Sequence, residues 1–268
     1  MKIAFIGGGV MAEAIIKGIL SHGICAAQEV CVGEPVESRR KELEQRHGLS
    51  TTSDNREAAE QGDLVVLAVK PQSLADVLAE LRGSLGKDQV VLSIIAGARV
   101  DTIASGLGHQ GVIRVMPNTP AQIGAGMSLW LASEGVAELY RETTRSILST
   151  LGKEMEVTDE KYLDMATALS ASGPAYVFLF IESLIDAGVY MGMPREMAHT
   201  LAVQTVLGSA MLAQETGRHP AELRDMVTSP GGTTAEALKV LETGRFRAVV
   251  MEAIVAAYEK SKSLGEQK

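Results

Sequence analysis

The sequence predicts an α/β fold in which a mostly parallel sheet domain is followed by an all-α domain. Three observations support this prediction. The chain has 268 residues, more than the roughly 100 to 150 of a typical single domain. Its first half alternates short β-branched runs with helical segments, a pattern typical of a parallel sheet that helices cover on both faces. Beyond residue 160 the alternation stops, and only helical patterns remain.

The elements of the first domain are expected in regular alternation. Strands are expected at residues 3–6, 30–32, 64–69, 90–95 and 112–115. Helices are expected at residues 11–20, 36–46, 73–81 and 100–107. The strands need no polar alternation, because both faces of a covered parallel strand are buried. Two further strands at 128–131 and 154–157, with a helix at 136–151, place this domain at residues 1–157.

The second domain, residues 158–268, is expected to need a partner. Its helical stretches at 175–191 and 194–215 carry apolar residues on most of the helix surface. Prolines fall where helices would start or stop, at Pro194, Pro220 and Pro230. A bundle of this size has too little interior to bury helices that are apolar nearly all round. We therefore expect a homodimer through the helical domain, or a higher homo-oligomer built on it.

Composition and charge exclude several classes of protein. Lys and Arg total 25 against 33 for Asp and Glu, so the net charge of −8 has the wrong sign for a nucleic-acid backbone binder. The longest apolar stretch, residues 175–181, is far shorter than the roughly 20 residues that span a bilayer, and the first residues do not resemble a signal peptide. We expect a cytoplasmic protein that binds neither nucleic acid nor membrane.

Metal and hydrolase chemistry are not favoured either. Cys25 and Cys31 lack the Cys-x-x-Cys spacing, and the five histidines form no His-x-x-x-His pair. No Gly-x-Ser-x-Gly sequence occurs. We expect no bound metal, and we interpret both cysteines as buried structural residues.

A glycine-rich turn follows the first strand directly. Gly7-Gly8-Gly9-Val10-Met11-Ala12 matches Gly-x-Gly-x-x-Ala between a strand and a helix, which is the Rossmann context for a dinucleotide. Gly7 allows the tight turn, Gly9 lets a pyrophosphate approach the backbone, and Ala12 lets helix and strand pack closely. Amides at the helix N-terminus then face the anion. The first domain is therefore predicted to be Rossmann-like, although a glycine turn that serves packing alone is the alternative.

Two signals disagree about which dinucleotide is bound. The residue that contacts the adenosine ribose is expected at the end of the second strand, where Glu34 stands. A carboxylate favours the free 2′-hydroxyl of NAD, whereas Arg39 and Arg40 would pair with the 2′-phosphate of NADP. A solvated helix start explains the two arginines equally well. The choice between the cofactors therefore stays open.

Other strand ends are expected at the same edge of the sheet. Ala68-Val69-Lys70-Pro71 and Ala96-Gly97 end two strands where ligands bind in doubly wound sheets. We interpret Lys70 as a solvated or phosphate-side charge rather than a catalytic base. The loop Met116-Pro117-Asn118-Thr119-Pro120 is either a structural turn or a wall of the nicotinamide pocket.

A second small-residue turn lies in the helical domain. Ser229-Pro230-Gly231-Gly232-Thr233-Thr234 precedes a helical segment at 235–241, and its exposed amides and hydroxyls suit a small carboxylate. The alternative is a capping box made by Thr233 and Glu236. Two adjacent glycines are not needed for capping, so we favour an anion site. The loop at residues 170–174 is a candidate pocket wall.

Together these motifs identify a family resemblance. The stretches Phe5 to Met11, Ala68 to Pro71, Met116 to Pro120, Ser172 to Tyr176 and Ser229 to Thr234 resemble pyrroline-5-carboxylate reductase, in order and over essentially the whole chain. The resemblance implies the last step of proline biosynthesis, the reduction of 1-pyrroline-5-carboxylate to L-proline by NADPH or NADH. It also implies that the helical half interlocks with a second subunit and brings its substrate loop to the nicotinamide.

The resemblance also assigns site residues. Its cofactor contacts fall on Ile6, Gly7, Gly8, Gly9, Val10, Met11, Asn55, Ala68, Val69, Lys70, Pro71, Ala96 and Gly97. Its substrate contacts fall on Glu160, Thr233 and Thr234, and we add Ser229, Gly231 and Gly232 as carboxylate donors. We hypothesise that Thr234 is catalytic, hydrogen-bonding the ring nitrogen and relaying its proton. Glu34 departs from the small hydroxyl residue of relatives that grip the 2′-phosphate.

Two alternatives remain. Another Rossmann imine or β-hydroxyacid oxidoreductase is one, although the second half has no helical Lys followed by Asn in a Gly-rich context. A non-enzymatic NAD(P) sensor is the other, and it would need no substrate loop at residues 229–234.

Overall fold

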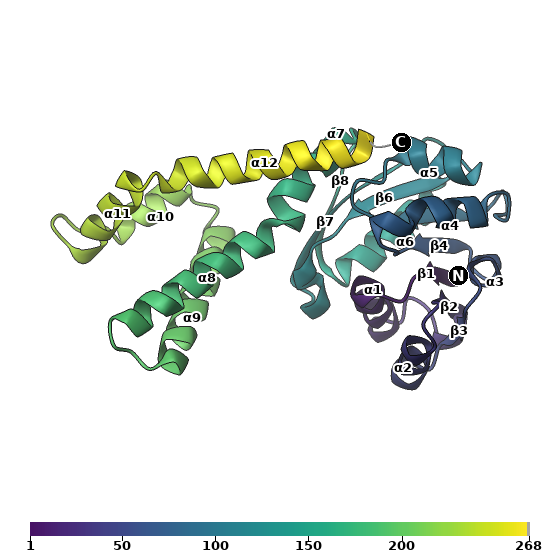
Figure 1. The fold of residues 1–268 in the computed structure, drawn as a ribbon, viewed down its shortest axis with the longest axis horizontal. Helices are drawn as coiled ribbons and strands as arrows, with labels where there is room; N and C mark the ends of the chain where they lie inside the picture. Colours follow the sequence, from purple (N-terminus) through teal and green to yellow (C-terminus); the bar gives the residue numbers. More distant parts are fainter. Residues whose placement is uncertain (267–268) are drawn as a thin grey trace. The chain divides into compact units, whose positions relative to one another are not determined.

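The computed structural model describes residues 1–266, which form two compact units (Figure 1). The first unit comprises Met1–Ser172 together with the stretch that begins at Ala257, and the second comprises Gly173–Ala256. The sheet lies in the first unit, and the second is helical. The boundary expected at residue 157 marks the end of the last expected strand rather than of a compact unit, and it stays a prediction.

An eight-stranded, mostly parallel sheet forms the first unit, which confirms the predicted fold class. Its order is β3 (Ser50–Thr52), β2 (Val30–Gly33), β1 (Ile3–Ile6), β4 (Leu64–Leu67), β5 (Val90–Ser93), β6 (Val112–Met116), β7 (Gly126–Ala132) and β8 (Gly152–Glu156). Every neighbouring pair is parallel except β6 and β7. The chain order reverses between β1 and β4, which is the position where doubly wound sheets bind their ligands.

Successive strand residues are buried on opposite faces of the sheet. Ile3 and Phe5 pack into one core, while Ala4 and Ile6 pack into the other. The first core is covered by α1 (Val10–Ser21), α2 (Glu37–His47) and α6 (Glu138–Ser149). The second is covered by α3 (Asn55–Glu60), α4 (Leu74–Leu81) and α5 (Val100–Leu107). Burial on both faces is why the strands are apolar without alternation.

Two short elements were not expected from the sequence. β3 is a polar edge strand of three residues, and its pattern of Ser and Thr carries no hydrophobic period. α3 has six residues and begins after Asp54, whose carboxylate accepts hydrogen bonds from the amides of Arg56 and Glu57. The expected elements of this unit begin and end within two residues of the observed ones. A short helix, α7 (Lys161–Ala166), and a π-helical turn at Thr167–Ala171 follow the last strand.

The second unit has little core of its own. It contains α8 (Gly173–Tyr190), α9 (Arg195–Thr216), α10 (Pro220–Met226), α11 (Thr233–Thr243) and the first part of α12 (Phe246–Glu266). Only a small cluster around Ile185, Ala198 and Ala202 is buried where α8 meets α9. Large apolar side chains remain exposed, including Phe178 at 62% and Leu179 at 64%. A single copy of the chain therefore leaves these helices uncovered, as expected from their apolar pattern.

Candidate functional site

The turn between β1 and α1 requires glycine at its first position. Gly7 has a φ of +98°, and a Cβ there would lie 2.8 Å from the carbonyl oxygen of Ala68. Its amide donates to the carbonyl of Gly33 at 2.8 Å. The turn is thus packed directly against the chain that leaves β4 and held to the end of β2. No other residue type fits this position without moving the backbone.

The following residues leave a row of amides facing outward. Gly9 is the residue before α1, with extended backbone and no side-chain cap, and a Cβ there would meet nothing within 4 Å. The amides of Gly9, Val10, Met11 and Ala12 have no acceptor within residues 1–266. Gly9 and Val10 are exposed. An open space bordered by free amides at the start of a twelve-residue helix suits a pyrophosphate.

The chain that leaves β4 runs beside this turn. The amide of Ala68 donates to the carbonyl of Ile6 at 2.9 Å, so the two strand ends are in register. Lys70 and Pro71 are exposed. Lys70 has no carboxylate partner in the described part of the chain. These positions agree with a backbone wall and a phosphate-side charge rather than a buried base.

Glu34 lies directly against the glycine turn. Its Oε2 accepts from the amide of Gly8 at 3.0 Å, and its Oε1 accepts from the amide of Val36 at 3.0 Å. Two backbone donors therefore fix the orientation of this carboxylate. The predicted ribose contact is at the expected edge of the sheet.

Arg39 braces the same turn from α2. Its Nε donates to the carbonyl of Gly8 at 2.8 Å, while Nη2 and Nη1 donate to Glu13 at 2.6 Å and Glu42 at 2.7 Å. Burial opposes the charge on Arg39, but the hydrogen bonds to Glu13 and Glu42 outweigh it and raise the pKa of the guanidinium. The sequence analysis considered Arg39 only as a phosphate ligand or a solvated charge, because its partner Glu13 is 26 residues away along the chain.

Asn55 and Gly97 occupy more internal positions. The Nδ2 of Asn55 donates to Glu80 at 2.8 Å, and its Oδ1 would lie 2.8 Å from a Cβ at Gly33. Asn55 therefore lies beneath the end of β2. Gly97 has a φ of +75°, and a Cβ there would lie 3.1 Å from Cβ of Leu264. Ala96 is half-buried beside it.

Glu160 belongs to a buried ion-pair cluster that the sequence did not reveal. Its Oε1 accepts from Nη1 of Arg114 at 2.8 Å and from the amide of Val100 at 2.8 Å. Arg99 lies 3.5 Å from the other oxygen, Oε2. Arg114 also donates to Asp164 at 3.0 Å. A lone arginine inside the apolar strand at residues 112–115 is the signal that could have indicated this cluster.

The second small-residue turn starts α11. Gly231 has a φ of +66°, and the amide of Gly232 donates to the carbonyl of Ser229 at 3.1 Å. A Cβ on Gly232 would lie 2.4 Å from Oγ of Ser229. Thr233 is the first helical residue rather than the cap, and the cap residue Gly232 makes no side-chain bond. The alternative of a Thr233–Glu236 capping box is therefore wrong, and the first amides of α11 have no acceptor among residues 1–266.

The loop at residues 116–120 has a structural role. Asn118 donates from Nδ2 to the carbonyl and Oγ of Ser170, both at 3.3 Å, and its Oδ1 accepts from the amide of Met127 at 2.9 Å. The loop thus ties β7 to the π-helical turn. Of the two interpretations of this loop, the structural turn has direct support.

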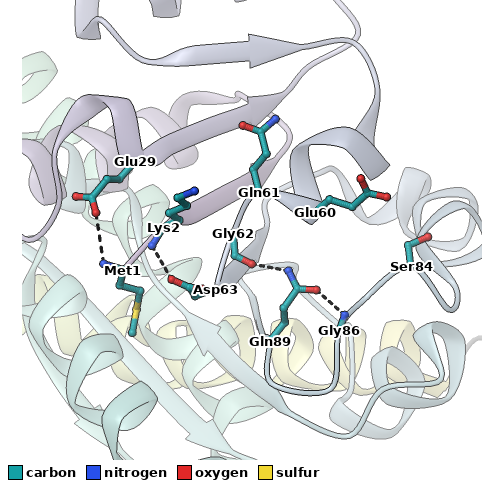
Figure 2. Close-up of a pocket in the computed structure, with 10 residues that line it drawn as sticks. All are labelled: Met1, Lys2, Glu29, Glu60, Gln61, Gly62, Asp63, Ser84, Gly86 and Gln89. Carbon is teal, nitrogen blue, oxygen red and sulfur yellow. Dashed lines mark hydrogen bonds and ion pairs between the residues drawn. The ribbon is translucent and has the colours of Figure 1, made fainter.

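A shallow polar pocket of about 780 Å³ lies at the opposite edge of the sheet, where the strands begin (Figure 2). Some of its polar groups are paired with one another, as in the amide of Lys2, which donates to Asp63 at 2.8 Å (Figure 2). The parallel strands therefore separate this pocket from the glycine turn. Within residues 1–266 no three His, Cys, Asp or Glu side chains are grouped to hold a metal ion.

Two family models match the chain. A model described as pyrroline-5-carboxylate reductase dimerisation matches residues 160–264. A model described as NADP oxidoreductase coenzyme F420-dependent matches residues 2–97. The curated relative named pyrroline-5-carboxylate reductase from Synechocystis sp. is 45% identical over 267 residues, covering 100% of this chain and 99% of its own.

Solved structures agree with the sequence comparison. A pyrroline-5-carboxylate reductase from Coxiella burnetii superposes with a TM-score of 0.90 and 38% identity, covering 99% of both chains. A pyrroline carboxylate reductase from Plasmodium falciparum with NADP bound gives a TM-score of 0.91 and 35% identity, covering 99% of this chain and 98% of its own. The similarity therefore includes both units.

Proposed function

The chain belongs to the pyrroline-5-carboxylate reductase family, and we propose that it reduces 1-pyrroline-5-carboxylate to L-proline with NADPH or NADH. This is the last step of proline biosynthesis. The observation that carries the proposal is a pair of glycine turns, each followed by a helix whose first amides have no acceptor within residues 1–266. One turn suits a dinucleotide and the other a small carboxylate.

The residues of the first unit fit a nicotinamide dinucleotide. Gly7 is required by the backbone, whereas Gly9 leaves open space that a Cβ would partly fill. The amides of residues 9–12 would hold the pyrophosphate, and Glu34 would contact the ribose. Residues 68–71 and 96–97, together with Asn55 beneath the end of β2, would complete the wall of the site. When bound, the reduced nicotinamide supplies a hydride, with its two electrons, to the imine carbon.

The residues of the second turn fit the substrate. We assign the amides of Gly231 and Thr233 and the hydroxyls of Ser229 and Thr233 to the carboxylate of the cyclic imino acid, whereas Gly232, whose amide donates to the carbonyl of Ser229, shapes the turn. Thr234 would donate a hydrogen bond to the lone pair of the neutral ring nitrogen and pass to it the proton that this nitrogen gains as its carbon gains the hydride, taking a proton back from water. The protein then mainly orients two reactants, because the imine is a good acceptor once its nitrogen is protonated.

Glu160 is proposed as a further substrate contact. Its Oε1 is occupied by Arg114 and the amide of Val100, whereas Oε2 has only the longer ion pair of 3.5 Å with the partly exposed Arg99, so Oε2 is the atom that a ligand would contact. A carboxylate oriented by a buried arginine is suited to a cationic ring nitrogen.

The exposed apolar helices are proposed to pair with a second copy of the chain. One helical stretch, Lys161–Tyr190, is long and apolar enough to cross a membrane by length and composition, and only 11% of its most apolar window is buried. Because residues 160–264 match a dimerisation model, we assign this surface to a subunit interface in a cytoplasmic homodimer.

One absorbance assay tests the activity. Purified protein is mixed with 1-pyrroline-5-carboxylate and either NADPH or NADH, and the loss of absorbance at about 340 nm is followed. We expect loss of absorbance that requires both substrate and protein, with L-proline as the product. Cofactor binding without turnover would favour a sensor, and turnover of other imines or β-hydroxyacids alone would favour a different reductase.

A further inference from the structure

We infer that this chain prefers NADH over NADPH, because Glu34 stands at the end of β2, where the ribose is expected, and Glu13 and Glu42 pair with Arg39 beside it. The inference rests on the proposed function of the glycine turn as a dinucleotide site. The two cofactors differ only by a phosphate on the 2′-oxygen of the adenosine ribose. Discrimination therefore depends on the charges next to the end of β2.

The first part of the argument is the fixed carboxylate. Glu34 follows β2 directly, and its two oxygens accept hydrogen bonds from the amides of Gly8 and Val36. A carboxylate with both oxygens held by backbone donors cannot turn away at small cost when a second anion approaches. It retains lone pairs that accept a hydrogen bond from a 2′-hydroxyl, whereas a 2′-phosphate would meet a like charge.

The second part is the fixed cation. An arginine attracts a 2′-phosphate most strongly when its charge is not already paired. Arg39 donates from each of its three guanidinium nitrogens, to the carbonyl of Gly8 and to the carboxylates of Glu13 and Glu42, which leaves one N–H on each Nη. Its side chain is only 19% exposed. Two carboxylates therefore neutralise the arginine that stands nearest to the turn.

Arg40 is the second arginine close to Glu34, and it is the one that could favour NADPH. Arg40 donates from Nη1 to the carbonyls of Glu34 at 2.7 Å and Pro35 at 2.9 Å, and no carboxylate pairs with it in the described residues. The carbonyl bonds tie it to the backbone of the loop that carries Glu34. If a 2′-phosphate recruits any residue here, that residue is Arg40, so its variant belongs in the test.

The test measures binding separately from turnover. Dissociation constants of NADH and NADPH are measured by calorimetry without substrate, and kcat/KM for each is measured with 1-pyrroline-5-carboxylate. We expect NADH to bind roughly tenfold more tightly or better. In Glu34→Gln, the dissociation constants of NADH and NADPH should differ by no more than a few fold. Glu37→Gln removes the same charge from an exposed position of α2 and should leave their ratio unchanged.

Four outcomes decide the matter. Tighter binding of NADPH than of NADH by the unaltered protein overturns the inference. If Arg40→Ala then loses this preference for NADPH, Arg40 is the residue that binds the 2′-phosphate. The inference is also overturned if Glu34→Gln unfolds at the same temperature as the unaltered protein and yet has the same ratio of NADH to NADPH dissociation constants. A preference for NADH without turnover supports the inference and contradicts the proposed function. Turnover of 1-pyrroline-5-carboxylate that is faster with NADPH than with NADH supports the proposed function and contradicts the inference.

Discussion

Arg114 and Glu160 are joined by a hydrogen bond of 2.8 Å between Nη1 and Oε1, so a fully buried residue of β6 holds the residue that precedes α7. Arg114 also donates to Asp164 at 3.0 Å. Removing the arginine would leave Asp164 without its cation and Glu160 with only the longer ion pair to the more exposed Arg99. We expect Arg114→Met to lower the free energy of unfolding by about 3–5 kcal/mol, measured by urea denaturation.

An exposed ion pair provides the control for this change. Lys41 lies 2.7 Å from Glu37 with both side chains largely exposed, so Lys41→Met should cost less than about 1 kcal/mol. Equal free energies of unfolding for Arg114→Met and Lys41→Met would show that the buried ion-pair cluster does not stabilise the fold.

Gly7 and Gly9 are expected to respond differently to the same substitution. Gly7→Ala places a Cβ at positive φ and 2.8 Å from a carbonyl oxygen, so it should destabilise the fold by about 1–3 kcal/mol. Gly9→Ala has an allowed backbone and an open space, so the fold should keep its stability within about 1 kcal/mol. The dissociation constant of the cofactor should rise roughly tenfold or more for Gly9→Ala. Thermal unfolding and calorimetry separate the two effects, and undiminished binding by Gly9→Ala would contradict the pyrophosphate assignment.

Thr234 is expected to contribute to catalysis through its hydroxyl. Thr234→Ala should lower kcat/KM for 1-pyrroline-5-carboxylate by roughly 100-fold or more, with little change in cofactor binding. Thr234→Ser keeps the hydroxyl and should restore most of the activity. Thr243→Ala, at the last residue of the same helix, should leave the rate unchanged. Full activity of Thr234→Ala in steady-state assays would remove this residue from the mechanism.

The contribution of Glu13 to stability should depend on pH. Burial alone would raise the pKa of this carboxyl, but hydrogen bonds from Arg39, His47 and Arg46 outweigh it and lower the pKa from 4.5 to about 2. A group with a lowered folded-state pKa stabilises the fold above its unfolded pKa and loses that contribution as the pH falls through the folded value. Allowing for solvent screening, Glu13→Gln should cost about 1–2 kcal/mol at pH 6 and much less at pH 2.5. Urea titrations at both values test this, and a constant difference would contradict it.

The exposed leucines of α8 should determine the oligomeric state. We expect the protein to sediment as a dimer or larger species at micromolar concentration. Leu179→Glu introduces a charge on the exposed face of α8 and should shift the population towards monomer. Leu139→Glu changes a similarly exposed leucine of α6, at 60% exposure, and should not shift the population towards monomer. A stable monomer of the unaltered protein in analytical ultracentrifugation would contradict the assignment.

The sequence predicted the elements that have strong hydrophobic periodicity. The buried strands and the helices that cover them follow from patterns that act over four to twenty residues, and the turn at Gly7 follows from local steric demands. The short polar β3 and α3 have no such period and were missed. The position of Glu34 at the end of β2 could be predicted from the sequence. The orientation of its carboxylate could not, because the amides of Gly8 and Val36 that fix it are brought to it only by folding.

Contacts between distant residues explain the remaining differences. Glu13 is 26 residues from Arg39, and Glu160 is 46 residues from Arg114, so neither pair forms a local pattern. A charged residue inside an apolar run indicates that a partner exists, but it does not say which residue supplies it. The three-dimensional arrangement alone identifies that partner.

The packing of Gly97 against Leu264 has a consequence for synthesis of the protein. The loop after β5 leaves the ribosome long before the last turns of α12, which belong to the same compact unit. At ordinary translation rates the residues from 172 to 266 take roughly 5–20 s to emerge. During that interval the sheet can form, but the surface around Gly97 and the buried site of Ser261 lack their partner. Completion of the first unit therefore follows synthesis of the whole helical region between its two parts.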